Sequence, residues 1–287
     1  DGYILGVHRI ANPGRIPVLL FHGLLDSSAT FVIMGPENSL GYILWHNGHD
    51  VWLGNSRGNR YSKNHTSLSP KNETFWDFSF HEMGIYDLPA IIDYILFTTG
   101  FTQLHYIGHS QGTTIFFVMC AKKPNYNEKI ILMQALAPAV FVSHVKSPLI
   151  PPLSFYLTNV MKQYKGEMFP NQYLKHSPCF KRNDDIILNN LIQFTLAPII
   201  FSHSPAGSSA KSFRHFVQLK DSEKFLEYDY GQNENLKRYG TDQPPKYNLA
   251  DVTAPIILHF AMKLFSLNLI HKQASRLTAI IRILLSI

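Results

Sequence analysis

The chain has 287 residues, of which 45% are hydrophobic, 13% aromatic and 16% charged. This composition allows a large buried core and excludes a disordered or fibrous chain, and the length allows one large domain or two small ones. Lys and Arg exceed Asp and Glu by 26 to 20, and the resulting net charge of +6 is too small for the basic footprint of a nucleic-acid-binding protein.

The first half of the chain alternates short apolar runs with a longer helical pattern. Residues 16–22 and 50–53 are each predicted to form a strand, because both runs are apolar and lead into glycine-containing turns. Between Phe75 and Thr99 apolar side chains recur mostly every three or four residues, which predicts a helix that Gly100 stops.

The alternation continues with a strand at 104–108, a helix at 112–122, a strand at 130–135 and a later strand at 256–260. Strands separated by helices are typical of a mainly parallel sheet with helices on both faces. The sequence therefore predicts an α/β fold. Between about 142 and 205 the alternation stops, and an insertion of this size is predicted to be a folded cap rather than a structureless loop.

Residues 108–112 read Gly-His-Ser-Gln-Gly, which matches the pattern G-x-S-x-G. In this motif a serine lies on a sharp turn between a strand and a helix, and the elements predicted on either side of Ser110 supply that context. Three fixed residues recur by chance in roughly one chain in ten of this length, so the alternative is a coincidental glycine turn. The context favours Ser110 as a nucleophile, with the N–H of Gln111 as one donor to the oxyanion of a tetrahedral intermediate.

A second oxyanion donor is expected from the loop after an early strand. That loop begins at His22-Gly23, which makes the N–H of Leu24 the candidate. The alternative is an ordinary glycine turn at the end of a strand. We interpret His22 as a residue that orients this loop and not as a base, because it lies on the oxyanion side of the site.

Several longer stretches are specific to one family. They are DGYIL at 1–5, HRI at 8–10, HGLLDSS at 22–28, DVWLGNSRGN at 50–59, GHSQGTT at 108–114 and SPAGSS at 204–209, with shorter matches at 224–225, 228–231 and 244–249. On these stretches the chain resembles the acid lipase family of α/β-hydrolases, which includes gastric lipase, lysosomal acid lipase and their insect relatives. The resemblance covers residues 1 to about 260.

The resemblance implies an α/β-hydrolase domain over residues 1–260, with 142–205 as an inserted cap or lid. It implies hydrolysis of carboxylic esters of neutral lipids, such as triacylglycerols or sterol esters, at a lipid–water interface. Ser110 would be the nucleophile, and the N–H groups of Leu24 and Gln111 would form the oxyanion hole. No cofactor or metal is expected, because neither a phosphate-cradling glycine loop nor a metal-ligand spacing is present.

The resemblance ends at about residue 260, and the atypical basic tail 261–287 departs from the family. The fold needs an acid and then a histidine after the last strand, but Leu264 stands where the acid belongs and no acidic residue follows Asp251. Asp251 precedes the strand and is expected at the wrong edge of the sheet. The histidine His271 comes too soon after the strand. The simplest explanation for the loss of resemblance is a shifted reading frame, an alternative exon or a defective gene model.

Four of the six net charges fall in this tail, as Lys263, Lys272, Arg276 and Arg282. Leucine and isoleucine residues between 277 and 285 recur at helical spacing, which predicts a basic amphipathic helix.

The sequence leaves two functions open. One is a serine ester hydrolase, and the other is a catalytically inactive lipid-binding or interaction protein that keeps the pocket without turnover.

The remaining patterns concern the cell route of the protein. The triplets that begin at Asn64 and Asn72 fit the N-glycosylation pattern, which favours a secreted or lysosomal protein. The chain opens at Asp1 without a signal peptide, which suggests a processed form or a fragment. Cys120 and Cys179 exclude a disulfide scaffold, and buried thiols are favoured over a single bridge. No apolar run is long enough for a transmembrane helix.

Overall fold

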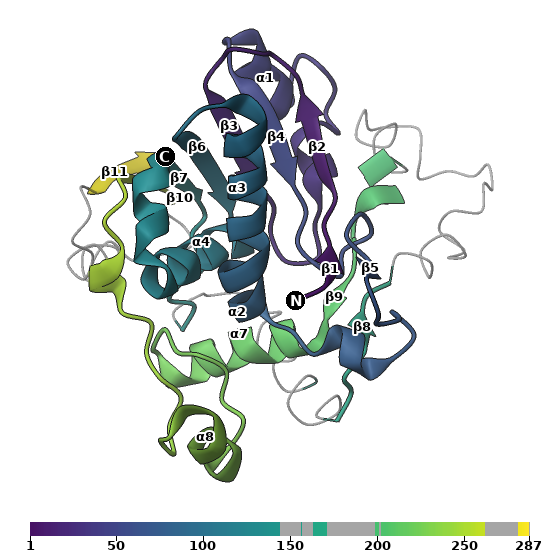
Figure 1. The fold of residues 1–287 in the computed structure, drawn as a ribbon, viewed down its shortest axis with the longest axis vertical. Helices are drawn as coiled ribbons and strands as arrows, with labels where there is room; N and C mark the ends of the chain where they lie inside the picture. Colours follow the sequence, from purple (N-terminus) through teal and green to yellow (C-terminus); the bar gives the residue numbers. More distant parts are fainter. Residues whose placement is uncertain (144–155, 157–162, 171–198, 201, 262–280, 287) are drawn as a thin grey trace, which may run out of the picture.

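The computed structural model describes residues 1–143, 156, 163–170, 199–200, 202–261 and 281–286. Seven strands of this described part form the main sheet, in the order β11-β10-β7-β6-β3-β4-β2. All neighbouring strands run parallel except β2, which pairs antiparallel with β4 at one edge. Figure 1 shows the helices α3 and α4 in front of this sheet. The α/β fold class predicted from the alternation is confirmed.

The strands of the main sheet are β2 (Val7–Ile10), β3 (Pro17–Phe21), β4 (Asp50–Gly54), β6 (Leu104–His109), β7 (Ile130–Leu136), β10 (Ile256–Ala261) and β11 (Ile281–Ser286). Two smaller sheets pair β1 (Tyr3–Ile4) with β5 (Asn64–His65) and β8 (Glu167–Met168) with β9 (Ser208–Ser209). The helices are α1 (Leu40–His46), α2 (Phe80–Glu82), α3 (Leu88–Thr99), α4 (Gln111–Lys122), α7 (Ala210–Ser222) and α8 (Gln232–Tyr239). Short 3₁₀ helices are η1 (Ser28–Phe31), η2 (Glu73–Trp76), η4 (Pro124–Lys129) and η8 (Leu249–Asp251).

Side chains of β3 alternate between two apolar cores, one on each face of the sheet. Leu19 and Phe21 join the larger core under α3 and α4, whereas Val18 and Leu20 join the smaller core under α1. This alternation follows from the two-residue period of a strand. A strand covered on both faces is apolar throughout, which explains why all five residues of β3 are buried.

The long helical pattern 75–99 is divided in the structure. Residues from Phe80 onward are helical, through α2, a π-helical turn at Met83–Asp87 and α3, and Gly100 ends α3 with a left-handed φ of 74°. The start was missed by five residues, because Ser79 and Glu82 form a capping box. The sequence signal S-x-x-E is present at 79–82 and would have placed the start correctly.

The tail prediction is wrong for the part that the structure describes. Residues 281–286 form β11, which pairs parallel with β10, where an amphipathic helix was expected. A short apolar run with β-branched residues fits the period of a helix as well as that of a strand. The free edge of β10 favours the strand, because it offers backbone hydrogen bonds to this run. The rest of the tail and most of the predicted cap 142–205 lie outside the described residues.

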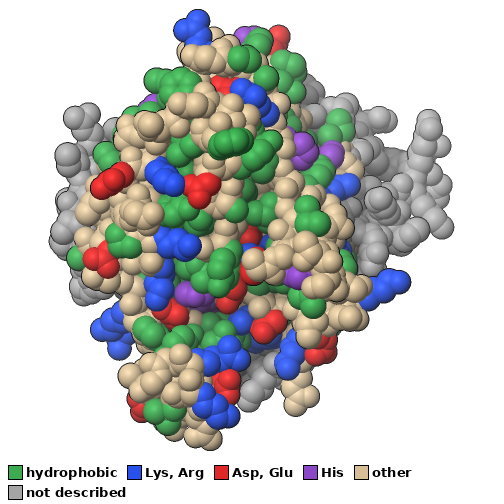
Figure 2. All heavy atoms as spheres, in the orientation of Figure 1, with side chains coloured by type: hydrophobic (Ala, Val, Ile, Leu, Met, Phe, Trp, Pro, Cys, Tyr) green, Lys and Arg blue, Asp and Glu red, His purple; other side chains and the backbone are tan. Residues whose placement is uncertain are grey.

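Two other expectations can be compared with the structure. Cys120 is a buried free thiol, as expected, and burial raises its pKa; Cys179 lies outside the described residues. Among the described helices none is long and apolar enough to cross a membrane. On the face seen in Figure 2, basic, acidic and hydrophobic side chains are interspersed, in keeping with the small net charge.

Candidate active site

Ser110 lies on a strained turn between β6 and α4. Its φ of 50° and ψ of −115° fall outside the common regions for a residue with a side chain. The Ser110 N–H donates to the carbonyl of Leu136 at 3.0 Å, and the Ser110 carbonyl accepts from the Thr113 N–H at 2.9 Å. The turn is therefore held by backbone bonds on both sides. Among the described residues, the Ser110 hydroxyl has no hydrogen-bond partner.

The two glycines of the motif let the strand, the turn and the helix approach closely. A Cβ on Gly108 would lie 2.8 Å from the carbonyl of Gly112, and a Cβ on Gly112 would lie 2.4 Å from the Phe21 carbonyl at the end of β3. Real Cβ atoms do not approach backbone atoms this closely. The turn therefore has the close-packed geometry of the nucleophile elbow that G-x-S-x-G predicts, and it is called the elbow below.

The loop after β3 lies directly against Ser110. A Cβ on Gly23 would lie 3.2 Å from the Cβ of Ser110. The Leu24 N–H follows at once, and no described residue accepts a hydrogen bond from it. The Gln111 N–H belongs to the first residue of α4 and has no acceptor within the helix. Both backbone donors named from the sequence thus belong to segments that meet at Ser110.

His22 stands behind this loop. It is buried, and its Nδ1 lies 2.8 Å from the carbonyl of Gly23. Its Nε2 receives the Ser56 N–H at 3.2 Å, and burial lowers the pKa of the ring. These contacts fit the loop-orienting interpretation, since His22 forms no hydrogen bond with Ser110.

The acid and base of a triad are not among the described contacts of Ser110. No described histidine forms a hydrogen bond with its hydroxyl, and the positions of Leu264 and His271 lie outside the described residues. Asp251 lies in η8, just before β10, where its carbonyl accepts from the Asn127 side chain at 3.0 Å. Because Ser110 follows the carboxyl end of β6 and the strands are parallel, Asp251 lies at the opposite edge of the sheet. No group of three or more potential metal ligands occurs within the described ranges.

Helix α7 packs against the loop after β3. Leu24 and Leu25 pack against a small core that includes Ala210 and Phe213 of α7. The carbonyl of Leu25 also accepts from the Ala206 N–H at 2.7 Å. The loop that carries the Leu24 donor is therefore held between the elbow and α7.

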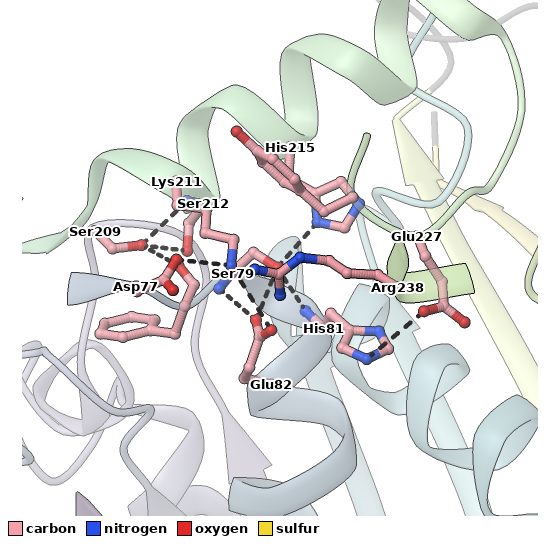
Figure 3. Close-up of polar contacts among 12 residues, drawn as sticks. Asp77, Ser79, His81, Glu82, Ser209, Lys211, Ser212, His215, Glu227 and Arg238 are labelled. Carbon is pink, nitrogen blue, oxygen red and sulfur yellow. Dashed lines mark hydrogen bonds and ion pairs between the residues drawn. The ribbon is translucent and has the colours of Figure 1, made fainter. Parts of the chain in front are cut away.

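Polar contacts fasten α7 to the segment around α2, as Figure 3 shows. The buried Lys211 ammonium lies 2.9 Å from Asp77 and 3.9 Å from Glu82. One turn later the ring of His215 stacks on Phe80 with centroids 3.8 Å apart, and its Nδ1 lies 3.0 Å from Ser79 Oγ. Local sequence patterns do not reveal these contacts, because the two segments are more than 120 positions apart in the chain.

The burial of His215 predicts acid sensitivity of the fold. Desolvation lowers the pKa of His215 to about 3, whereas an unfolded chain protonates its histidines at about 6.5. The unfolded chain therefore binds the extra proton between these values, and the free energy of unfolding falls as pH falls through that window. At pH 5 the expected loss from this one group is about 2 kcal/mol.

Urea unfolding at several pH values between 7 and 4 measures this effect. The control is His215→Gln, whose side-chain amide can still donate to the Leu226 carbonyl that His215 Nε2 contacts at 3.0 Å. Its stability should fall less steeply with acid than that of the unchanged chain. Equal slopes for both proteins would contradict the assignment to His215.

Comparisons with known proteins agree with this geometry. Residues 16–172 match the family model described as alpha/beta hydrolase fold. Lipase 1 of Drosophila melanogaster is 47% identical over 272 residues, which cover 91% of this chain and 62% of that protein. Gastric triacylglycerol lipase of Bos taurus is 40% identical over 281 residues, which cover 89% of this chain and 71% of that protein. The chain thus spans less than two thirds of the first of these relatives.

Solved structures show the same fold at low identity. A monoacylglycerol lipase from Paleococcus ferrophilus is 16% identical with a TM-score of 0.55, over 99% of this chain and 89% of that one. A putative aryl esterase from Burkholderia cenocepacia is 15% identical with a TM-score of 0.56, over 100% of this chain and 86% of that one. With the strained Ser110 elbow and the relatives above, the chain belongs to the α/β-hydrolase family, in the group of lipases that includes gastric triacylglycerol lipase.

Proposed function

We propose that the protein hydrolyses carboxylic esters of neutral lipids, with triacylglycerols or sterol esters as substrates. The observation that carries the proposal is the elbow, where Ser110 projects from a strained turn beside two backbone N–H groups with no described acceptor. Relatives named as lipases at 40% and 47% identity support the same reaction.

The chemistry follows from the positions of these groups. Ser110 Oγ attacks the ester carbonyl, and the oxygen of that carbonyl becomes an anion. The N–H groups of Leu24 and Gln111 stabilise the anion, because they are held in place before the reaction and do not have to reorient. The bond to the alcohol breaks, the proton lost by the Ser110 hydroxyl goes to the departing alcohol, and the acyl group stays on Ser110 as an ester. Water then attacks this ester, returns a proton to Ser110 Oγ and releases the carboxylic acid.

The described part of the predicted cap favours an apolar substrate. Five large hydrophobic side chains of this region are between 37% and 46% exposed, namely Tyr156, Tyr164, Phe169, Ile199 and Ile200. Exposed apolar side chains of this kind supply surface that can contact lipid. We assign these described residues of the predicted cap to contact with a lipid–water interface.

Labelling of Ser110 by a fluorophosphonate, together with turnover of emulsified tributyrin and of soluble p-nitrophenyl butyrate, tests the proposal. We expect stoichiometric labelling of Ser110 and turnover of both esters. A folded protein that binds lipid vesicles but shows neither labelling nor turnover would be the inactive lipid-binding protein, and the hydrolase proposal would fail.

We also propose a secretory route with glycans on Asn64 and Asn72. Both side chains are exposed, Asn64 on β5 and Asn72 just before η2. Exposed acceptors can receive a glycan without disturbing the core. A secreted or lysosomal location agrees with a relative named gastric lipase.

A further inference from the structure

The hydrogen bonds around His22 determine which ring nitrogen carries the proton. Nε2 lies 3.2 Å from the Ser56 N–H and 3.1 Å from Asn59 Nδ2. A backbone N–H can only donate, so Nε2 has to accept there and carries no proton. The Ser56 hydroxyl is the remaining described neighbour that could accept from Nε2, and at 3.4 Å it is the most distant.

The side chain of Asn59 also indicates that Nε2 of His22 carries no proton. Its amide group is held in one orientation by its other hydrogen bonds. Asn59 Oδ1 accepts the backbone N–H groups of Tyr61 at 2.9 Å and Ser62 at 3.1 Å. On the other side, Asn59 Nδ2 donates to Asn55 Oδ1 at 2.8 Å, and that oxygen also accepts the Ser28 N–H at 2.9 Å. A flipped Asn59 amide would break its own three bonds, to Tyr61, Ser62 and Asn55. Asn59 therefore presents its NH₂ group to His22.

The proton on the other ring nitrogen has a direct consequence for the oxyanion donor. Neutral His22 with a bare Nε2 carries its proton on Nδ1, which donates to the Gly23 carbonyl at 2.8 Å. That carbonyl and the Leu24 N–H belong to one planar trans peptide group and point in opposite directions. Holding the carbonyl towards His22 therefore turns the Leu24 N–H away from His22. The turn bond from the Asp26 N–H to the same carbonyl is longer, at 3.3 Å.

We propose that His22 and Asn59 are positioning residues for the oxyanion hole: Asn59 and the Ser56 N–H together impose the tautomer of His22, and His22 thereby holds the Gly23–Leu24 peptide with its N–H available to the substrate oxyanion. Asn59 is buried, and both residues act through Leu24 without touching substrate. This proposal rests on the proposed ester hydrolysis and adds two positioning residues to its site. The hydrogen bonds of His22 join the loop after β3 to the turn after β4, two segments that are separate in the sequence.

Nitrogen NMR of the full chain tests the tautomer without any need for activity. We expect His22 to show a protonated Nδ1 and a bare Nε2 at neutral pH. A proton on Nε2 would overturn the proposal, because Nδ1 could then not donate to Gly23. If the protein fails to hydrolyse p-nitrophenyl butyrate, the proposed function fails, yet this measurement still decides the tautomer.

Two substitutions of His22 separate positioning from mere support of the fold. In His22→Asn the side-chain NH₂ replaces Nδ1 and keeps a donor for the Gly23 carbonyl, but the acceptor at Nε2 is lost. In His22→Gln the amide reaches the Nε2 position and can accept there, but the donor to Gly23 is lost. We expect His22→Gln to lower kcat about 10- to 100-fold with KM within about threefold, since a whole oxyanion donor is worth about 100- to 1000-fold.

The order of the two variants in stability should be the opposite of their order in kcat. His22→Asn leaves two buried donors without an acceptor and should have the lower Tm, yet it should retain at least tenfold more kcat than His22→Gln. The amide signal of Leu24 should likewise shift in His22→Gln more than in His22→Asn, whether or not the chain is active. Losses of kcat that simply follow losses of Tm would overturn the proposal.

A matched pair of buried asparagines tests the role of Asn59 in holding the tautomer of His22. Asn59→Ala is compared with Asn235→Ala, because Asn235 is equally buried and also binds backbone and side-chain groups, at Tyr230, Asp229 and Asp242. Both variants should lose stability, but only Asn59→Ala should lower kcat, by about three- to tenfold. Equal kcat values for the two variants would show that Asn59 does not help to position the oxyanion donor.

Discussion

Replacing Ser110 by alanine is expected to lower ester hydrolysis roughly ten-thousand- to million-fold and to leave the fold almost unchanged. The loss of rate follows because the nucleophile is gone while the oxyanion donors remain. The small effect on stability follows because, within the described ranges, the Ser110 hydroxyl makes no hydrogen bond. Turnover of p-nitrophenyl butyrate and the Tm measure the two effects.

Ser39→Ala is a suitable control for this experiment. Ser39 precedes α1 and also has a hydroxyl without a partner in the described chain, so the same atom is removed at a position away from the elbow. The control should keep its activity and its Tm. If Ser110→Ala retained more than about one percent of the rate, another group would be the nucleophile.

Gly112→Ala is expected to destabilise the protein by about 3 kcal/mol and to reduce activity. The added methyl group would lie 2.4 Å from the Phe21 carbonyl and 2.9 Å from the His22 carbonyl. To accommodate it, α4 and the end of β3 have to separate, which moves Ser110 away from the loop that carries Leu24. Urea unfolding and kcat measure both consequences on the same protein.

Gly100→Ala provides the comparison for this glycine. Gly100 ends α3 with a φ of 74° and has no neighbour within 4 Å of an added Cβ, so alanine there meets backbone strain only. We expect a cost of about 1 kcal/mol and no change in kcat. A cost at Gly112 no larger than that at Gly100 would show that the contact with Phe21 does not limit the elbow.

Much of the sheet could be predicted because buried parallel strands are continuous apolar runs. The predicted strands 16–22, 50–53, 104–108 and 130–135 differ by one or two residues at most from β3, β4, β6 and β7. Errors arose where a pattern was ambiguous. The helix predicted at 75–99 was placed to start five residues too early, because the capping-box signal at Ser79 was overlooked. The predicted helix in the tail is a strand at 281–286, because β10 has a free edge there.

The turn at Ser110 could be recognised from consecutive residues. Gly108, Ser110, Gln111 and Gly112 are neighbours in the chain, and the sterics of a sharp turn between a strand and a helix act on a few consecutive residues. Local pattern therefore sufficed to place this turn and to mark Ser110 as the candidate nucleophile and the Gln111 N–H as a candidate donor. The loop with Leu24 could be named as well, because it follows a recognisable strand.

The contacts that hold these parts in place come from distant segments of the chain. His22 receives its hydrogen bonds from Ser56 and Asn59, which follow another strand, and α7 supports the same loop from a position almost 200 residues further along the chain. Parallel strands bring their carboxyl ends to one edge of the sheet whatever their separation in sequence. No local pattern encodes which side chains meet there, because their contacts depend on packing between distant segments.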